Sequence, residues 1–263
     1  MKGSNHSLAI RGTTLSVALL IVFLTAWQWG PGLLRIPPFI IPPLSAVFNE
    51  AVRMWNVSGL AFHTGITAAE VLAGFILGSL LGASIGYLIG MSPTAEFALS
   101  PYILALQIAP KVAFAPLFIL WMGFTIYPKI LVAILIVFFP VMVNVLTAIR
   151  TVDPDLINLA RAFKAKRAQI FWRIDFPASL PPLFAGLRIG STLAVVGGVF
   201  GELVGGNAGL GYLLSFGEGQ ANTAMAFVAI VMLTLGGGLA YLLVILIELR
   251  VLHYLPKRAQ MGF

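Results

Sequence analysis

Charge is scarce in this chain, and cysteine is absent. Only 10% of the 263 residues are charged, whereas about 25% are charged in a typical soluble protein. Hydrophobic residues make up 59% of the sequence, and the mean hydropathy is +0.99. These values are typical of an integral membrane protein. The lack of cysteine excludes disulfides and metal sites with thiolate ligands.

Motifs of catalysis and nucleotide binding are also missing. The sequence has no G-x-x-x-x-G-K-[ST] phosphate-binding loop and no cluster of metal-ligand residues. Its three histidines, His6, His63 and His253, lie near the predicted ends of apolar runs and do not cluster. We therefore expect no enzymatic activity, no cofactor and no metal in this chain, so any ATP hydrolysis must come from a partner.

Apolar runs of membrane-spanning length dominate the sequence. A hydrocarbon core about 30 Å thick needs roughly 20 helical residues. Six runs reach this length, two of them with one internal cation: 13–34, 71–95, 100–123, 130–149, 183–204 and 220–247. They are apolar on every side, unlike the alternating strands of a barrel. We predict an all-α integral membrane protein of about six transmembrane helices, with residues 1–263 forming a single transmembrane domain.

The cations in the loops predict the orientation. The first run is interpreted as a retained helix and not as a signal peptide, because it continues through AWQWG and offers Leu24 where cleavage needs a small residue. With both termini in the cytoplasm, only Arg35, Arg53 and Lys129 lie on the outer side. We attribute the net charge of +7 to this topology and to anionic lipid, and not to nucleic acid.

Glycines recur at every fourth position of the second predicted helix. They are Gly74, Gly78, Gly82, Gly86 and Gly90. This spacing places them on one helical face, and small residues let a second helix approach closely in a membrane. Gly197, Gly201 and Gly205 repeat the pattern in the fifth run. We predict a tightly packed bundle with these glycines at helix contacts.

Prolines interrupt the third run. Pro101, Pro110 and Pro116 each remove a backbone donor from the helix. Irregular backbone at membrane depth is tolerated where it is buried or lines a cavity. The third span is therefore a candidate wall of a translocation pathway.

Ionisable and polar residues inside the runs extend this hypothesis. Glu70 and Arg188 lie near predicted helix ends, whereas Lys111 and Glu202 are better placed to face a polar cavity. The pathway candidates are Gln107, Lys111, Asn144, Ser191, Thr192 and Glu202. Hydrogen bonding to a neighbouring helix is the alternative role of each.

A charged segment with several prolines, TVDPDLINLARAFKAKRAQIFWRIDFPASLPPLFAGLR, follows Arg150. Asp153 can cap a helix, Pro154 suits its first position and Asp155 favours its positive end. We predict an amphipathic helix over residues 154–168 and a second short helix over 169–174 that ends at FPASLPP. Such helices form a docking surface for a soluble partner. A solvated basic loop is the alternative.

The same segment resembles the cytoplasmic loop of permease subunits of binding-protein-dependent ABC importers. That loop has the pattern Glu-Ala-Ala, three residues, Gly, nine residues, Ile, one residue and Leu-Pro. Ala160, Ile174 and Pro177 match the pattern, and Asn158, Leu159, Lys164 and Phe176 depart from it. Lys164 stands at the glycine position, and because lysine disfavours positive φ, it argues against a standard turn there.

Similarity to this family extends over nearly the whole chain. PPLSAVF, APLFILWMGFTIYPKI, PASLPPLFAGLRIG and GELVGGNAGLGYLL all resemble it. The nearest branch handles nitrate, sulfonates and taurine and has relatives for pyrimidine precursors and riboflavin. Within this branch, the stretch APKVAFAPLFILWMG is more similar to the members that transport heterocycles. The resemblance implies a type I ABC importer permease in a bacterial cell (inner) membrane. It also implies a homodimer of permeases, two ATPase subunits that bind ATP and Mg, and an external substrate-binding protein.

On this resemblance, residues 150–180 form the cytoplasmic coupling loop between the fourth and fifth helices. The implied ATPase-coupling residues are Asn158, Leu159, Ala160, Arg161, Phe163, Lys164, Ala165, Ile174 and Pro177. Leu159, Ala160 and Phe163 would supply apolar contact with the ATPase, and Arg161 and Lys164 would supply charge at the rim.

The resemblance also implies a small polar solute, either an anion such as a sulfonate or nitrate, or a heterocycle such as a pyrimidine or riboflavin. The alternative function is a self-sufficient secondary transporter or channel, in which Lys111 and Glu202 would relay ions or protons.

Overall fold

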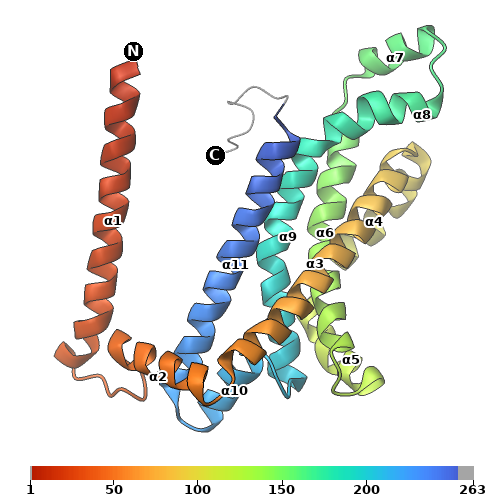
Figure 1. Cartoon of the computed structure of the whole chain (residues 1–263). Coiled ribbons are helices and arrows are strands. Elements are labelled where there is room, and N and C mark those ends of the chain that lie inside the picture. Colours follow the sequence, from red (N-terminus) through yellow and green to blue (C-terminus); the bar gives the residue numbers. More distant parts are fainter. Residues whose placement is uncertain (1, 254–263) are drawn as a thin grey trace. The chain divides into compact units, whose positions relative to one another are not determined.

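The structure is a computed structural model that describes residues 2–253, with side chains from residue 12 onward. The predicted orientation counts Lys2, Arg11, Lys257 and Arg258 as cytoplasmic cations. Their side chains, and that of His6, lie outside the described residues. All regular elements that are described are helices, as predicted (Figure 1). In chain order they are α1 Lys2–Leu33, α2 Leu44–Asn56, α3 Leu60–Gly90, α4 Pro93–Ile108, the 3-10 turn η1 Lys111–Phe114, α5 Ala115–Met122, α6 Tyr127–Arg150, α7 Pro154–Ala162, α8 Arg167–Ile170, the π turn η2 Phe171–Asp175, α9 Phe176–Gly205, α10 Leu210–Gly219 and α11 Thr223–Val251.

Two compact units make up the described chain. The first holds the residues up to Phe62 together with Leu213–Val231. The second holds His63–Tyr212 and the residues from Met232 onward, and it contains the predicted loop and every pathway candidate.

The first unit is held together by contacts between α1, α2 and their connection. Trp27 Nε1 donates to the carbonyl of Pro42 at 3.1 Å, and the amide of Ser45 donates to Gln28 Oε1 at 2.8 Å. The second bond satisfies a free amide in the first turn of α2. Neither α2 nor α10 is among the predicted helices, because each is too short to give an apolar run of membrane-spanning length.

The described residues contain five candidate membrane spans, or six if one bent pair of helices is a single span, in agreement with the prediction of about six. Five single helices are long and apolar enough, and the sixth is the pair Pro93–Ile108 and Lys111–Met122, bent by 78°. The bend lies at Pro110, which disfavours helical geometry in Ala109 (ψ 136°). The predicted interruption is wrong at Pro101 and Pro116, which lie inside α4 and in the first turn of α5, where the chain stays helical.

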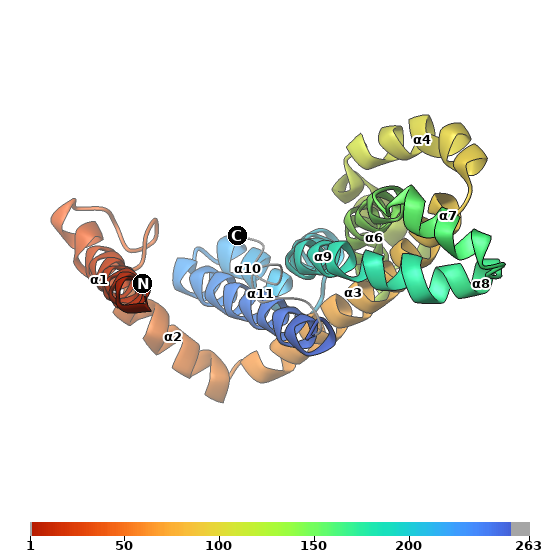
Figure 2. The same cartoon turned by 90° about the horizontal axis from the view of Figure 1, so that it is seen from above.

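In the second unit, α6 lies beside α9, and α3 crosses both (Figures 1 and 2). The glycine stripe of α3 faces α6. A Cβ atom at Gly74 would lie 2.3 Å from the Cβ of Ala133, and one at Gly82 would lie 2.6 Å from the carbonyl oxygen of Phe138. The other three glycines of the stripe approach α6 almost as closely. Because such distances leave no room for a side chain, glycine sets the spacing between α3 and α6.

Of the three predicted contact glycines of α9, Gly197 and Gly201 pack against the same helix, α6, whereas Gly205 packs against Ile119 of α5. A Cβ atom at Gly197 would lie 2.6 Å from the Cα of Ala133, and one at Gly201 would lie 2.8 Å from the Cα of Lys129. Ala133 is therefore contacted by glycine from both neighbouring helices. A buried apolar cluster of Val71, Val137, Val141 and Ala194 joins the three helices.

We predict that Gly82→Ala destabilises the protein, because the added methyl group would collide with the backbone of α6. Overpacking of this kind costs about 1–3 kcal/mol. Gly65→Ala is the matched control, since Gly65 lies on the same helix with nothing within 4 Å of its built Cβ. The midpoint of thermal unfolding in detergent measures both. Equal midpoints for the two variants would contradict the close approach of α3 and α6.

Candidate functional site

The predicted docking helix is present as α7. Asp153 caps it through a bond from the amide of Asp155 at 2.9 Å, and Pro154 occupies its first turn. The helix ends at Ala162, so the predicted end at residue 168 is wrong. Figure 1 shows α7 and α8 beyond the end of α6 and α9 that is opposite α5.

A tight turn at Lys164 ends α7. Lys164 has φ 55°, its amide donates to the carbonyl of Arg161 at 2.8 Å, and the amide of Ala165 donates to the carbonyl of Ala160 at 3.0 Å. These two bonds are those of a Schellman motif, which normally has glycine at the left-handed position. The prediction that lysine argues against this turn is wrong. The two bonds offset a strain of about 1–2 kcal/mol in the lysine backbone.

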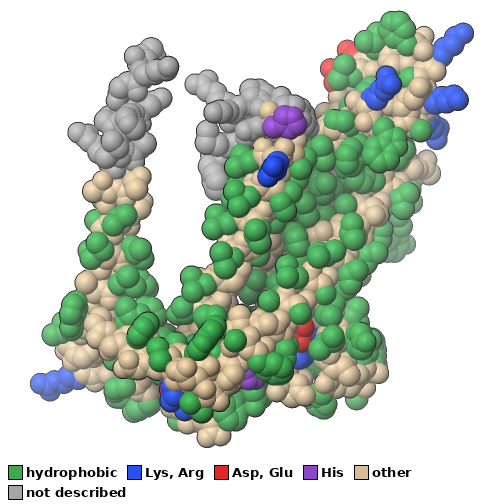
Figure 3. Space-filling view, in the orientation of Figure 1, with side chains coloured by type: hydrophobic (Ala, Val, Ile, Leu, Met, Phe, Trp, Pro, Cys, Tyr) green, Lys and Arg blue, Asp and Glu red, His purple; other side chains and the backbone are tan. Residues whose placement is uncertain are grey.

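An apolar face of α7 points away from the protein. Leu156, Leu159 and Phe163 are 51%, 57% and 79% exposed, and their spacing places them on one side of the helix. Arg161 and Lys164 are exposed beside this face. Figure 3 shows Lys and Arg side chains gathered at this end of the second unit. A solvated loop would have no reason to expose three large apolar side chains together, so the arrangement favours a docking surface.

The remaining loop candidates lie around this surface. Asn158 is exposed, whereas Ala160, Ala165, Ile174 and Pro177 are half-buried. The predicted end of the second short helix at FPASLPP is wrong, because α8, η2 and α9 form one continuous helical span, Arg167–Gly205. The π turn just before Pro177 lets the helix continue, since local π geometry can satisfy backbone groups that proline leaves without a partner.

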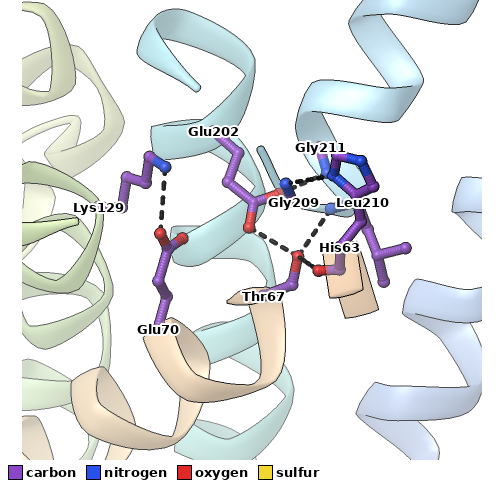
Figure 4. Close-up of polar contacts among 8 residues, drawn as sticks. All are labelled: His63, Thr67, Glu70, Lys129, Glu202, Gly209, Leu210 and Gly211. Carbon is purple, nitrogen blue, oxygen red and sulfur yellow. Dashed lines mark hydrogen bonds and ion pairs between the residues drawn. The ribbon is translucent and has the colours of Figure 1, made fainter. Parts of the chain in front are cut away.

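A buried ion pair joins α3 to the first turn of α6 (Figure 4). Lys129 Nζ lies 3.1 Å from Glu70 Oε1, and the two side chains are 3% and 2% exposed. Glu70 thus lies inside α3 and not near its end, and the side chain of Lys129, in the first turn of α6, is buried. The helix α3 extends past Glu70 to Leu60, whereas the apolar run in the sequence begins at Val71.

Glu202 on α9 forms a second part of this buried polar cluster. Thr67 donates to Glu202 Oε1 at 2.6 Å, and the amide of Gly211 donates to Glu202 Oε2 at 2.5 Å. The Thr67 hydroxyl accepts from the amide of Leu210 at 2.7 Å. Glu202 is 1% exposed, and both of its carboxylate oxygens accept hydrogen bonds from the surrounding chain.

The loop that follows α9 depends on this carboxylate. Gly209 has φ 114°, and a Cβ atom there would lie 2.2 Å from the Glu202 carboxyl carbon. The amide of Gly209 donates to His63 Nδ1 at 3.0 Å. Glycine is thus required at this position both by conformation and by space. Glu202 holds the start of α10 against α3 and α9.

The other pathway candidates are bonded mainly within their own helices or turns. Lys111 donates to the carbonyl of Gln107 and lies 4.9 Å from the Phe139 ring centroid. Asn144, Ser191 and Thr192 each donate to a carbonyl one turn earlier on the same helix. Thr192 also lines a hollow of about 290 Å³ between α9 and α11. The structure therefore brings Lys111 and Gln107 together, and within the described chain no hydrogen bond or ion pair connects Lys111 to Glu202.

Several residues of the buried polar cluster are not among the predicted site residues. His63, Thr67 and Glu70 recur at intervals of four and three, which places them on one helical face. That spacing is the signal that could have identified them together. Arg188, predicted near an interface, pairs with Glu248 on α11 at 3.2 Å. Neither ion pair can be read from the sequence, because each joins different helices.

Comparison with known proteins gives a consistent result. Residues 74–260 match the family described as "Binding-protein-dependent transport system inner membrane component". The riboflavin transport system permease protein RibX of Chloroflexus aurantiacus is 39% identical over 240 residues, 90% of this chain and 87% of the relative. The taurine transport system permease protein TauC of Escherichia coli is 31% identical over 84% of this chain and 83% of the relative.

A solved structure shares the fold. A chain of the MetNI methionine ABC transporter, in an inward-facing conformation, matches with a TM-score of 0.55 and 18% sequence identity. The match covers 70% of this chain and 94% of that chain. It supports the predicted type of permease fold.

We predict that Lys129→Met destabilises the protein by about 3–5 kcal/mol, because it leaves the Glu70 carboxylate buried without a cation. Glu70→Gln combined with Lys129→Met removes both charges and should recover most of the loss. Thermal unfolding of the two variants in detergent tests this. A single variant as stable as the wild type would show that the two side chains are not a buried ion pair.

Proposed function

Since this chain belongs to the inner membrane components of binding-protein-dependent transport systems, in the branch of ABC importer permeases for sulfonates, taurine and riboflavin, we propose that it forms the translocation pathway of an ABC importer. Two copies would assemble with two cytoplasmic ATPase subunits and an external substrate-binding protein. The ATPase subunits would bind ATP and Mg. Both termini of the chain would lie in the cytoplasm.

The exposed apolar face of α7 is the observation that carries this proposal. Leu159 and Phe163 fit an apolar cleft, and Arg161 and Lys164 provide charge at its rim. The surface projects from the end of helices that are apolar enough to cross a membrane. It is therefore accessible to a soluble subunit on one side of the membrane.

The helical connection between α7 and the membrane spans supports a mechanical role for this surface. Residues Arg167–Gly205 form one continuous helical span, and α9 packs closely on α6 through glycine. A displacement of α7 and α8 would thus move α9 together with its neighbours. Closure of the ATPase dimer around nucleotide would drive this displacement and exchange the inward-open and outward-open states.

The solute is proposed to be small and polar, and a heterocycle is favoured over an anion. The relative named for riboflavin is 39% identical over 90% of the chain, whereas those named for aliphatic sulfonates and for taurine are 33% and 31% identical over 92% and 84%. Specificity would come largely from the external binding protein. The candidates Gln107, Lys111, Asn144 and Thr192 remain proposed contacts of the pathway.

The alternative, a self-sufficient secondary transporter, gains no support from the described residues. A relay between Lys111 and Glu202 would need the two groups to connect, yet each has separate partners. Lys111 binds the carbonyl of Gln107, whereas Glu202 binds Thr67 and the amide of Gly211. The exposed face of α7 also has no role in that function.

We predict that Arg161→Glu combined with Lys164→Glu removes the ATPase subunit from the complex or uncouples its hydrolysis from transport. The two introduced carboxylates would repel a partner surface whose charge is complementary to Arg161 and Lys164. The protein is purified from its native membrane in mild detergent, its partners are identified by mass spectrometry, and ATPase activity is measured.

Two control variants separate charge from other effects. Lys164→Gly keeps the turn and removes the charge without reversing it, so it should retain most of the bound ATPase. Arg250→Glu reverses an exposed cation at the end of α11, outside the loop, and should behave as the wild type. Normal coupling in the double charge reversal would contradict the roles of Arg161 and Lys164.

We predict that the purified complex, reconstituted with its binding protein, imports riboflavin or a pyrimidine in preference to taurine. ATP-dependent uptake of each labelled solute into proteoliposomes measures the preference. Uptake of taurine alone would place the protein on the anion side of the branch. Uptake by this chain without an ATPase would show that the secondary mechanism is correct.

A further inference from the structure

A cluster of aromatic side chains joins η2 and the start of α9 to α3. The Tyr87 ring, on α3, meets the Phe171 ring edge-on with centroids 5.5 Å apart, and its centroid lies 6.0 Å from that of Phe176. Trp172 packs on both phenylalanines, at 5.2 and 5.3 Å. The two ring partners of Tyr87 come from η2 and from the first residue of α9, which is where α8 passes into the membrane span.

A short chain of hydrogen bonds crosses the same contact. The hydroxyl of Ser179 donates to the carbonyl of Phe176 at 2.8 Å. Because serine has only one hydroxyl proton, Tyr87 must be the donor in its 2.5 Å contact with Ser179. Ser179 is fully buried, so losing the Tyr87 donor leaves an acceptor without its partner in a site closed to water.

The π turn places these groups where they meet. A π turn adds a residue to one helical turn and is frequent at functional sites. Phe171 is the first residue of this turn and Phe176 directly follows it, and both rings contact Tyr87. Tyr87 thus contacts the helical span at the π turn between α8 and α9. This turn precedes the part of α9 whose glycines pack against α6.

We infer that Tyr87 and Ser179 are positioning residues that transmit movement of α7 and α8 to α3 as well as to α9. The inference rests on the proposed coupling function. Without the contact, α8 and η2 could shift while α3 stays behind. With it, α3 and α9 are connected at this end by Tyr87 and Ser179, and at the other end by Thr67 and Glu202.

The test uses the whole importer, with Tyr87→Phe, Ser179→Ala and the two combined. Tyr87→Phe keeps the ring contacts and removes only the hydroxyl. We expect the ATPase subunit to stay bound, while stimulation of its hydrolysis by solute-loaded binding protein falls about threefold to tenfold, the range set by one hydrogen bond. The combined variant should be no worse than either single one, since all three lose the same bond.

Tyr102→Phe, which alters an exposed tyrosine on α4, is the matched control and should leave stimulation unchanged. Wild-type stimulation in Tyr87→Phe would overturn the inference and leave the proposed function intact. Additive losses in the combined variant would also overturn it, because the two side chains would then act separately. A wild-type protein that binds no ATPase would instead refute the proposed function itself.

Discussion

The close packing of α6 between the glycine faces of α3 and α9 is the constraint on which the rest of the second unit depends. Apolar side chains gain little by leaving lipid for another helix, so helices in a membrane associate through close packing and polar contacts. Glycine allows both neighbours to reach the backbone of α6 near Ala133. Lys129 and Glu70 are buried side by side between the same two helices.

Polar contacts then connect the same helices at both ends. Glu202 and Thr67 join α9 to α3 and hold the glycine loop that begins α10. Tyr87 and Ser179 join the opposite end of α3 to the start of α9. Buried polar groups in a membrane are costly unless they are paired, so these contacts have defined partners. On the proposed function, three helices linked in this way would move as one body when an ATPase displaces α7.

The turn at Lys164 shows that a loop geometry can persist when its usual residue is replaced. Glycine adopts φ 55° without backbone strain, whereas lysine is strained there. The hydrogen bonds from the amides of Lys164 and Ala165 stabilise the strained conformation. The replacement also places a cation beside the exposed face of α7. A motif compared by residue identity alone therefore understates how closely this loop follows the geometry of a Schellman turn.

The helical membrane class, the approximate number of spans and the glycine spacing follow from the sequence, because they depend on local composition. The prolines of the third run predict an interruption, but which of them bends the chain does not follow from the sequence. The pairing of Glu70 with Lys129, the contact of Glu202 with the loop at Gly209 and the end of α7 at Ala162 are seen only in the folded chain. Each of the first two depends on which helices become neighbours, and glycine packing sets that arrangement. The end of α7 depends on backbone bonds strong enough to hold a lysine in a conformation that its side chain disfavours.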